Sequence, residues 1–348
     1  MVRYKTQFLI VTLLFISIQA VGEDLLSKKL LKEIFPESSK IAVCKTLKPV
    51  ASQKYDFLGP EASSALEKLL QNLRSENIEQ LQKLFHPRLK IKKSDINGVI
   101  SSIWASYGKK SSINIYKIMA VTNPEDQPEL IPCQNETYAI RAQFGYPIQL
   151  AGLIQITGKK EIGYLFVSLV PYNNSFVIGA FHSWQWTHLH KDHQAWVEEA
   201  HKDFAEKRPE LAWVKIDIAR KLLDGKPYFQ DEKLQEYSNI AKDLLKQEQV
   251  FTDIKTALLP KKIEYIGTSL TTQGISLLIR SRLEKELSTN QLRAFCQESF
   301  EALNAKFPSL KELNGLYCGF LAPSEQDFTR DGAWGGFLYS PTAKTSGT

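Results

Sequence analysis

Residues 60–89, PEASSALEKLLQNLRSENIEQLQKLFHPRL, decide the class of fold of this 348-residue chain. Leucines recur there three and four positions apart, which is the spacing of one face of an α-helix. The first stripe consists of Leu66, Leu69, Leu70 and Leu73, and the second of Ile78, Leu81, Leu84 and Phe85. A polar break at residues 75–77 separates the stripes, and Pro87 ends the second because its ring removes a backbone donor. The stretch therefore predicts two helices that cover an apolar surface.

A change of period follows a third helical stripe at residues 93–108. Apolar residues then alternate with polar ones, as in a β-strand. The first strand contains Ile113, Ile115, Ile118 and Ala120, with Tyr116 and Lys117 interrupting the alternation. Further strands are predicted at residues 138–144, 150–157, 162–170 and 176–186. Three helices before an antiparallel meander predict an α+β fold with an antiparallel sheet.

Two of these stretches carry a family resemblance. LLQNLRSENIEQLQKLFHPRL (69–89) resembles the opening of the nuclear-transport-factor-two-like (SnoaL-like) superfamily, and FVIGAFHSWQW (176–186) is similar to its final strand. The resemblance covers about residues 60–188 and rests on the order of elements. It implies a cone with a pocket between helices and curved sheet. Because this superfamily has many functions, the resemblance predicts a fold and leaves the activity open.

The rest of the chain predicts a helical connecting segment and a small second module with the order β-β-α-β-β. In this module two strands precede a helix at residues 288–307, and two more follow it. We find no repeat at a fixed period. The expected ranges are 1–22 for a signal peptide, 23–58 for an amphipathic helix and linker, 59–188 for the cone, 189–258 for the connecting segment and 259–343 for the module.

The first 22 residues have the layout of a secretory signal peptide. Arg3 and Lys5 precede an apolar run at residues 8–18, and small residues follow at Ala20 and Gly22. The run is shorter than the roughly 20 residues that a membrane span needs. We therefore expect export to the periplasm or the extracellular space, with no stable membrane span in the mature form. The formal charge of +6 is scattered, which argues against nucleic acid as a partner.

Four widely spaced cysteines suggest disulfides in an exported protein. Cys296 lies on the inward stripe of the predicted helix, and Cys318 shares a strand face with Leu316 and Phe320. Helix and strand are consecutive elements, so we expect a Cys296–Cys318 disulfide. The remaining pair, Cys44–Cys133, would fasten the N-terminal segment to the sheet.

The chemistry of the chain concentrates in FHSWQWTHLHKDHQAW, residues 181–196. By alternation, His182, Trp184 and Trp186 share a strand face with Phe176, Ile178 and Ala180, and we expect a turn near Thr187. If that face lines the cone, the candidate ligand-binding residues are Trp104, Tyr146, His182, Trp184 and Trp186. The candidate metal ligands are His188, His190, Asp192 and His193, but a regular helix cannot bring all of them together.

The expected function is binding, without catalysis, of a small apolar ligand or of another envelope protein. No cofactor is predicted, because no phosphate loop, nucleophile elbow or HExxH motif occurs. Two alternatives stay open. One is a hydrolase, isomerase or lyase that uses His182 as its base, with Asp192 or Glu161 as partner. The other is a metal-binding protein that uses the turn from His188 to His193.

Overall fold

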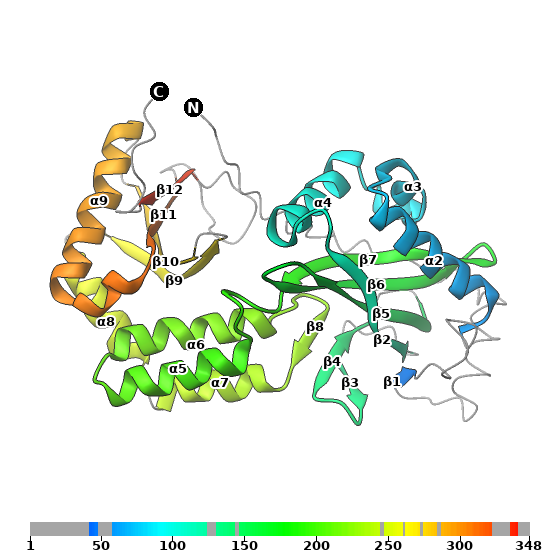
Figure 1. Cartoon of the computed structure of the whole chain (residues 1–348), viewed down its shortest axis with the longest axis horizontal. Coiled ribbons are helices and arrows are strands. Elements are labelled where there is room, and N and C mark those ends of the chain that lie inside the picture. Colours follow the sequence, from blue (N-terminus) through cyan, green and yellow to red (C-terminus); the bar gives the residue numbers. More distant parts are fainter. Residues whose placement is uncertain are drawn as a thin grey trace. The chain divides into compact units, whose positions relative to one another are not determined.

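The computed structural model describes residues 42–47, 58–123, 130–142, 146–243, 247–259, 262–271, 274–283, 287–321 and 335–339. The expected signal peptide and the predicted amphipathic helix lie outside these residues. The described elements form an α+β protein, as the sequence predicts, with an eight-stranded sheet and a four-stranded sheet (Figure 1). Two compact units contain these sheets.

The large sheet has the strand order β7-β6-β5-β2-β1-β3-β4-β8. Its strands are β1 (Val43–Leu47), β2 (Ser112–Thr122), β3 (Leu130–Gln134), β4 (Tyr138–Arg141), β5 (Ile148–Thr157), β6 (Ile162–Tyr172), β7 (Ser175–Gln185) and β8 (Phe229–Asp231). All neighbours are antiparallel except β1 and β3, which run parallel. The sequence predicts the long strands β2, β5, β6 and β7 and also β4. It misses the short strands β1, β3 and β8.

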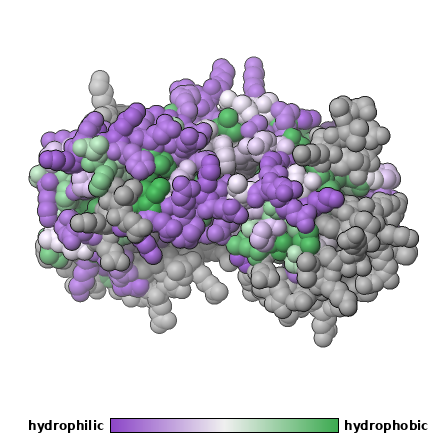
Figure 2. Space-filling model, turned by 90° about the horizontal axis from the view of Figure 1, so that it is seen from below, coloured by the Kyte–Doolittle hydropathy of each residue, from purple (hydrophilic) through white to green (hydrophobic). Residues whose placement is uncertain are grey.

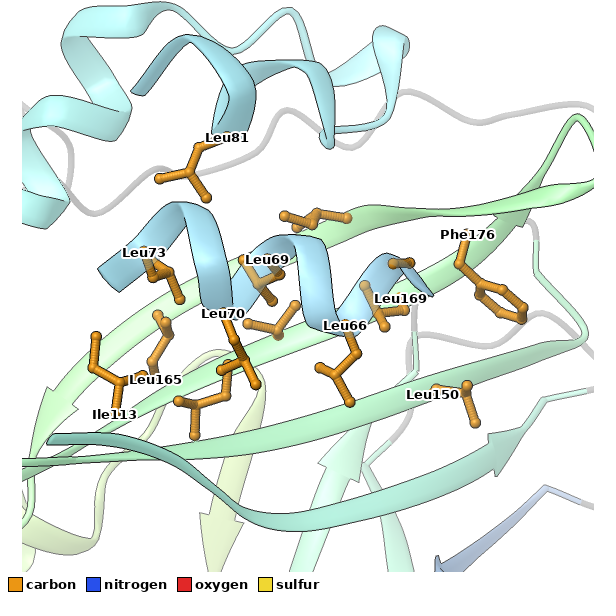
Figure 3. Packing of buried hydrophobic residues seen from close by; sticks show 14 of the residues in the cluster. Leu66, Leu69, Leu70, Leu73, Leu81, Ile113, Leu150, Leu165, Leu169 and Phe176 are labelled. Carbon is orange, nitrogen blue, oxygen red and sulfur yellow. The ribbon is translucent and has the colours of Figure 1, made fainter. Parts of the chain in front are cut away.

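Three helices cover one face of this sheet: α2 (Pro60–Arg74), α3 (Ile78–Lys83) and α4 (Lys93–Tyr107). The four leucines of the first stripe point from α2 toward the strands (Figure 3). Each is at most 3% exposed. Between α2 and the sheet lies a cavity of about 10 Å³ lined by Leu58, Leu66, Ile118, Leu150, Gly152, Val167 and Leu169. That volume is about one water molecule, so leucine side chains fill the place where the resemblance implies a ligand pocket.

The sheet curls away from α2–α4, and its two edge strands meet on the opposite face. The ring of Trp184 on β7 stacks on that of Phe229 on β8, with centroids 5.2 Å apart. The preceding residue, Tyr228, stacks on Phe166 of β6 at 5.4 Å. These rings belong to a second core that also contains the Cys44–Cys133 disulfide. The concave face is therefore packed with aromatic side chains.

Two β-bulges change which side chains share a face. At Tyr116 the register between β2 and β5 shifts, so that Ile115 and Ile118 both face the helices. At Gly179 the register between β6 and β7 shifts in the same way. The expectation that His182, Trp184 and Trp186 share a face with Phe176 and Ile178 is therefore wrong. A bulge inserts one residue and moves every later side chain to the other face.

The four-stranded sheet has the order β12-β11-β10-β9, with β10 and β11 parallel. Its elements are β9 (Ile263–Thr271), β10 (Gly274–Arg282), α9 (Thr289–Lys306), β11 (Gly315–Leu321) and β12 (Gly335–Tyr339), in the predicted β-β-α-β-β order. A capping box begins α9, because Ser288 and Gln291 bond each other's backbone N–H. The Cys296–Cys318 disulfide fastens α9 to β11. Both disulfides are the pairs that the sequence predicts.

Four helices lie between the two sheets in the chain: α5 (His193–Ala205), α6 (Pro209–Leu223), α7 (Lys233–Asp243) and α8 (Gln247–Ala257). Residues 191–222 and those after 234 belong to the second compact unit, whereas Leu223–Leu234 return to the first. That return supplies β8 to the large sheet. The chain therefore passes from one unit to the other after His190, after Leu222 and after Leu234.

Each sheet has an edge strand with backbone groups already bonded from outside the sheet. On β7, the N–H of Ile178 donates to the carbonyl of Leu84, and its carbonyl accepts from the N–H of His86. On β9, the N–H of Thr268 donates to Asp217 Oδ2 at 3.1 Å, and Lys221 Nζ donates to the Thr268 carbonyl. An edge whose groups are matched offers fewer sites for pairing with another chain.

The part of the surface drawn in Figure 2 is mainly hydrophilic, with small separate hydrophobic patches. Large apolar side chains that are clearly exposed include Tyr116, Leu189, Phe204, Leu259 and Tyr265. In the described residues, we find no helix with the length and apolarity that a membrane crossing requires. Two disulfides indicate that the chain folds in an oxidising compartment.

Candidate functional site

An aromatic cluster on the concave side of the large sheet is the candidate site. Its members, which we call the aromatic face, are Tyr116, Tyr164, Trp184 and Trp186. Tyr164 lies at the centre, with ring centroids 5.2 Å from Tyr116, 5.8 Å from Trp184 and 5.0 Å from Trp186. The Tyr164 and Trp186 rings meet edge to face at 79°. Such pairs stabilise each other beyond the area they bury.

The bulge in β2 exposes the outermost ring of the aromatic face. Tyr116 is the extra residue between Ile115 and Lys117, and its side chain is 52% exposed. Beneath it, Tyr164 is only 5% exposed. Burial and the neighbouring Tyr116 hydroxyl raise the pKa of Tyr164 above its usual value, so this phenol stays neutral. Bulges often redirect side chains beside functional sites.

A polar cluster borders the aromatic face. Lys117 Nζ lies 2.5 Å from Glu136 Oε2, and Thr46 Oγ1 donates to Glu136 Oε1 at 3.0 Å. Burial alone would raise the pKa of Glu136, but the hydrogen bonds from Lys117 and Thr46 lower it below its usual value. Burial alone would lower the pKa of Lys117. The hydrogen bond to Glu136 has the opposite effect, and the pKa of Lys117 is raised above its usual value. Lys117 and Glu136 are therefore both charged at neutral pH, and their opposite charges cancel.

The ammonium of Lys117 also contacts aromatic rings. It lies 4.9 Å from the ring centroid of Tyr138 and 5.6 Å from that of Tyr116. A second polar side chain at the aromatic face is Gln155, whose amide donates from Nε2 to Tyr164 Oη at 3.3 Å. Charged and amide groups thus hold fixed positions around the rings.

His182 lies two residues before Trp184 on β7, and its ring contacts those of Trp184 and Tyr228. Both ring centroids are 6.3 Å from the imidazole. Burial lowers the pKa of His182, and the carboxylate of Asp224 opposes that shift. Among the described residues, we find no hydrogen bond to its ring. Neither partner suggested by the sequence contacts it, because Asp192 caps α5 by accepting from Ala195 N–H and Glu161 accepts from Thr187.

The candidate metal ligands have other roles in the structure. His188 is 2% exposed and its Nδ1 lies 3.0 Å from Gln185 Nε2, whereas His193 Nδ1 lies 2.8 Å from Tyr237 Oη. Leu189 and His190 have positive φ angles of 51° and 63°, so the helix begins only at His193 and not at residue 189. Within the described ranges, no three His, Cys, Asp or Glu side chains come together as a metal would require.

The other two predicted ligand-binding residues lie elsewhere. Trp104 is on α4, on the helix side of the sheet, where it lines a shallow groove of about 350 Å³. The groove is also lined by Glu76, Ile78, Asn97, Ile100, Ser101, Ala105 and Lys109. The ring of Tyr146 packs edge to face on His86 at 5.9 Å. Of the five predicted residues, His182, Trp184 and Trp186 are thus brought together.

Comparisons with protein-family models, with curated proteins and with solved structures gave no match for this chain. Sequence reasoning missed Tyr116 and Tyr164, which complete the aromatic face, and Lys117, which borders it. The sequence does contain a signal for a β-bulge at Tyr116 and Lys117. Ile115 and Ile118 are three positions apart in a strand whose apolar residues otherwise alternate.

Proposed function

We propose that this chain is an exported binding protein without catalytic activity and that it binds its ligand on the aromatic face. The single observation that carries the proposal is the exposure of Tyr116. An aromatic side chain that is 52% exposed, beside the 5% exposed ring of Tyr164, leaves apolar surface in water. Covering that surface with a ligand is favourable in free energy.

Export supports the same proposal. The basic head, apolar run and small residues at 1–22 have the layout of a cleaved signal peptide, and two disulfides suit an oxidising compartment. The likeness to the nuclear-transport-factor-two-like superfamily is compatible with binding. We place the ligand on the concave side, because leucines fill the space beneath α2.

Thermal unfolding of the mature chain with four ligand classes tests the proposal. The classes are neutral oligosaccharides, quaternary ammonium compounds, short peptides and fatty acids. At about 100 times Kd, a ligand that binds only the folded state adds about 2.7 kcal/mol to the free energy of unfolding. We expect one class to raise the Tm of the wild type and to have little effect on Tyr116→Ala.

The matched control is Tyr265→Ala in the second unit, where the tyrosine is 42% exposed. This variant should respond like the wild type. The proposal is wrong if no class raises the Tm of the wild type, or if Tyr116→Ala keeps the full shift.

A further inference from the structure

We propose that the ligand of the aromatic face is a neutral saccharide. This inference rests on the proposed function and adds the chemical class of the ligand. Three features of the site support it: the arrangement of the rings, the balance of charge, and the polar groups at the border.

The rings present apolar surfaces in more than one plane. The Tyr116 ring is tilted by 48° from that of Tyr164, and the Trp186 ring by 79°. The faces of aromatic rings carry partial negative charge. They therefore attract C–H groups with partial positive charge, such as the axial hydrogens of a pyranose ring. A saccharide can place such a C–H surface on Tyr116 while its hydroxyl groups point outward.

The balance of charge argues against ionic ligands. Lys117 is paired with Glu136 at 2.5 Å, and their side chains are 25% and 19% exposed. An anionic ligand would have to compete with Glu136 for the ammonium. A quaternary ammonium ligand would seek the π-face of an exposed ring, and the ammonium of Lys117 already lies 5.6 Å from the centroid of Tyr116. A neutral ligand meets neither obstacle.

The polar border argues against a purely apolar ligand. Gln155, Glu136, Lys117 and Thr46 would lose contact with water under such a ligand without gaining hydrogen bonds, which is costly. Hydroxyl groups can replace that water, because each both donates and accepts. The Gln155 amide is oriented by its bond to Tyr164 Oη and has a second N–H for a ligand.

Isothermal titration of the mature chain tests the class of ligand. The probes are tetrasaccharides of glucose and of N-acetylglucosamine, each with α and β linkages where they exist. We expect at least one probe to bind the wild type. Tyr116→Ala should weaken its binding about tenfold, and Tyr116→Phe should keep it near the wild-type value, because the ring remains.

Tyr265→Ala is the control and should bind like the wild type. The saccharide proposal is overturned if the probes bind Tyr116→Ala and wild type equally. It is also overturned if no tetrasaccharide binds while another class raises the Tm through Tyr116, and in that case the proposed binding function survives. If no class acts through Tyr116, both proposals fail.

Discussion

His86 shows how one buried side chain combines capping, packing and titration. Its Nδ1 accepts from the N–H of Arg88 at 3.1 Å, at the start of the short 3-10 helix Pro87–Leu89. Its ring, 5% exposed, packs against Tyr172 at 4.6 Å. Burial, aided by the charge of Arg88, lowers the pKa of His86 from its usual 6.5. The folded protein thus favours the neutral imidazole.

This lowered pKa predicts a loss of stability in mild acid. As the pH falls below about 6.5, the unfolded chain takes up a proton on His86 before the folded chain does. The stability contributed by neutral His86 is present above that pH and is lost as the pH falls through the lower, folded pKa. We expect the free energy of unfolding to fall less in His86→Asn than in the wild type between about pH 7.5 and about pH 5.5.

Asparagine retains a side-chain acceptor for the Arg88 N–H but does not titrate. The variant therefore keeps the capping hydrogen bond and removes only the effect of protonation. Urea unfolding at both pH values gives the comparison. The lowered pKa values of Glu79, Glu136 and Glu199 act below about pH 4.5 and do not disturb it. Equal losses in both proteins would show that His86 titrates normally in the folded state.

At the scale of elements, the long pieces of the fold are predictable and the short ones are not. The leucine stripe of α2 and the alternation in β2, β5, β6 and β7 mark these elements in the sequence. By contrast, β1 has five residues and β8 has three, and each pairs with strands far away in the chain. A short segment carries too little periodicity for a prediction, and tertiary pairing decides its conformation.

The candidate site shows the same limit. The three predicted residues that the structure brings together, His182, Trp184 and Trp186, lie in β7 or directly after it. Their face could not be predicted, because the bulge at Gly179 inserts one residue between two apolar stretches and leaves no interruption in the pattern. At Tyr116, a polar interruption does mark the bulge.

The Cys44–Cys133 disulfide should contribute more to stability than the Cys296–Cys318 disulfide. It joins two residues directly opposite each other on the parallel strands β1 and β3, 89 positions apart in sequence, whereas Cys296 and Cys318 are 22 apart. In the chain-entropy estimate these loops correspond to about 4.6 and about 3.4 kcal/mol. We expect the double substitution of Cys44 and Cys133 by Ser to lower the free energy of unfolding by about 3–5 kcal/mol.

Denaturant unfolding without reductant measures that loss, with the Cys296 and Cys318 double serine variant as the comparison. Non-reducing peptide mapping of the wild type should first show both links. A smaller loss at Cys44 and Cys133 than at the other pair would contradict the order given by loop length.

At the scale of the whole molecule, the path of the chain decides which fragments can fold. The first unit includes β8, which comes after α5 and α6 in the sequence. A fragment that ends at His190 lacks Tyr228 and Phe229, which are 8% and 3% exposed in the full chain. Their loss uncovers Phe166 and Trp184.

We therefore expect the fragment ending at His190 to unfold without a sharp transition and to bind a hydrophobic dye. Truncating a single buried aromatic side chain to alanine already costs about 3–5 kcal/mol. A longer fragment ending at Leu234 retains β8 and should regain the near-ultraviolet circular dichroism of the stacked rings. Cooperative unfolding of the shorter fragment would show that β8 is dispensable.

The bonds that Asp217 and Lys221 make to Thr268 bear on how molecules of this protein meet one another. A sheet grows from chain to chain when a foreign strand finds a row of open donors and acceptors. At this point of β9 an incoming strand would first have to displace a carboxylate and an ammonium, which also contact each other at 3.0 Å. Fibre growth from this edge therefore begins with a penalty, and concentrated solutions of the protein should stay clear for longer than those of Asp217→Ala.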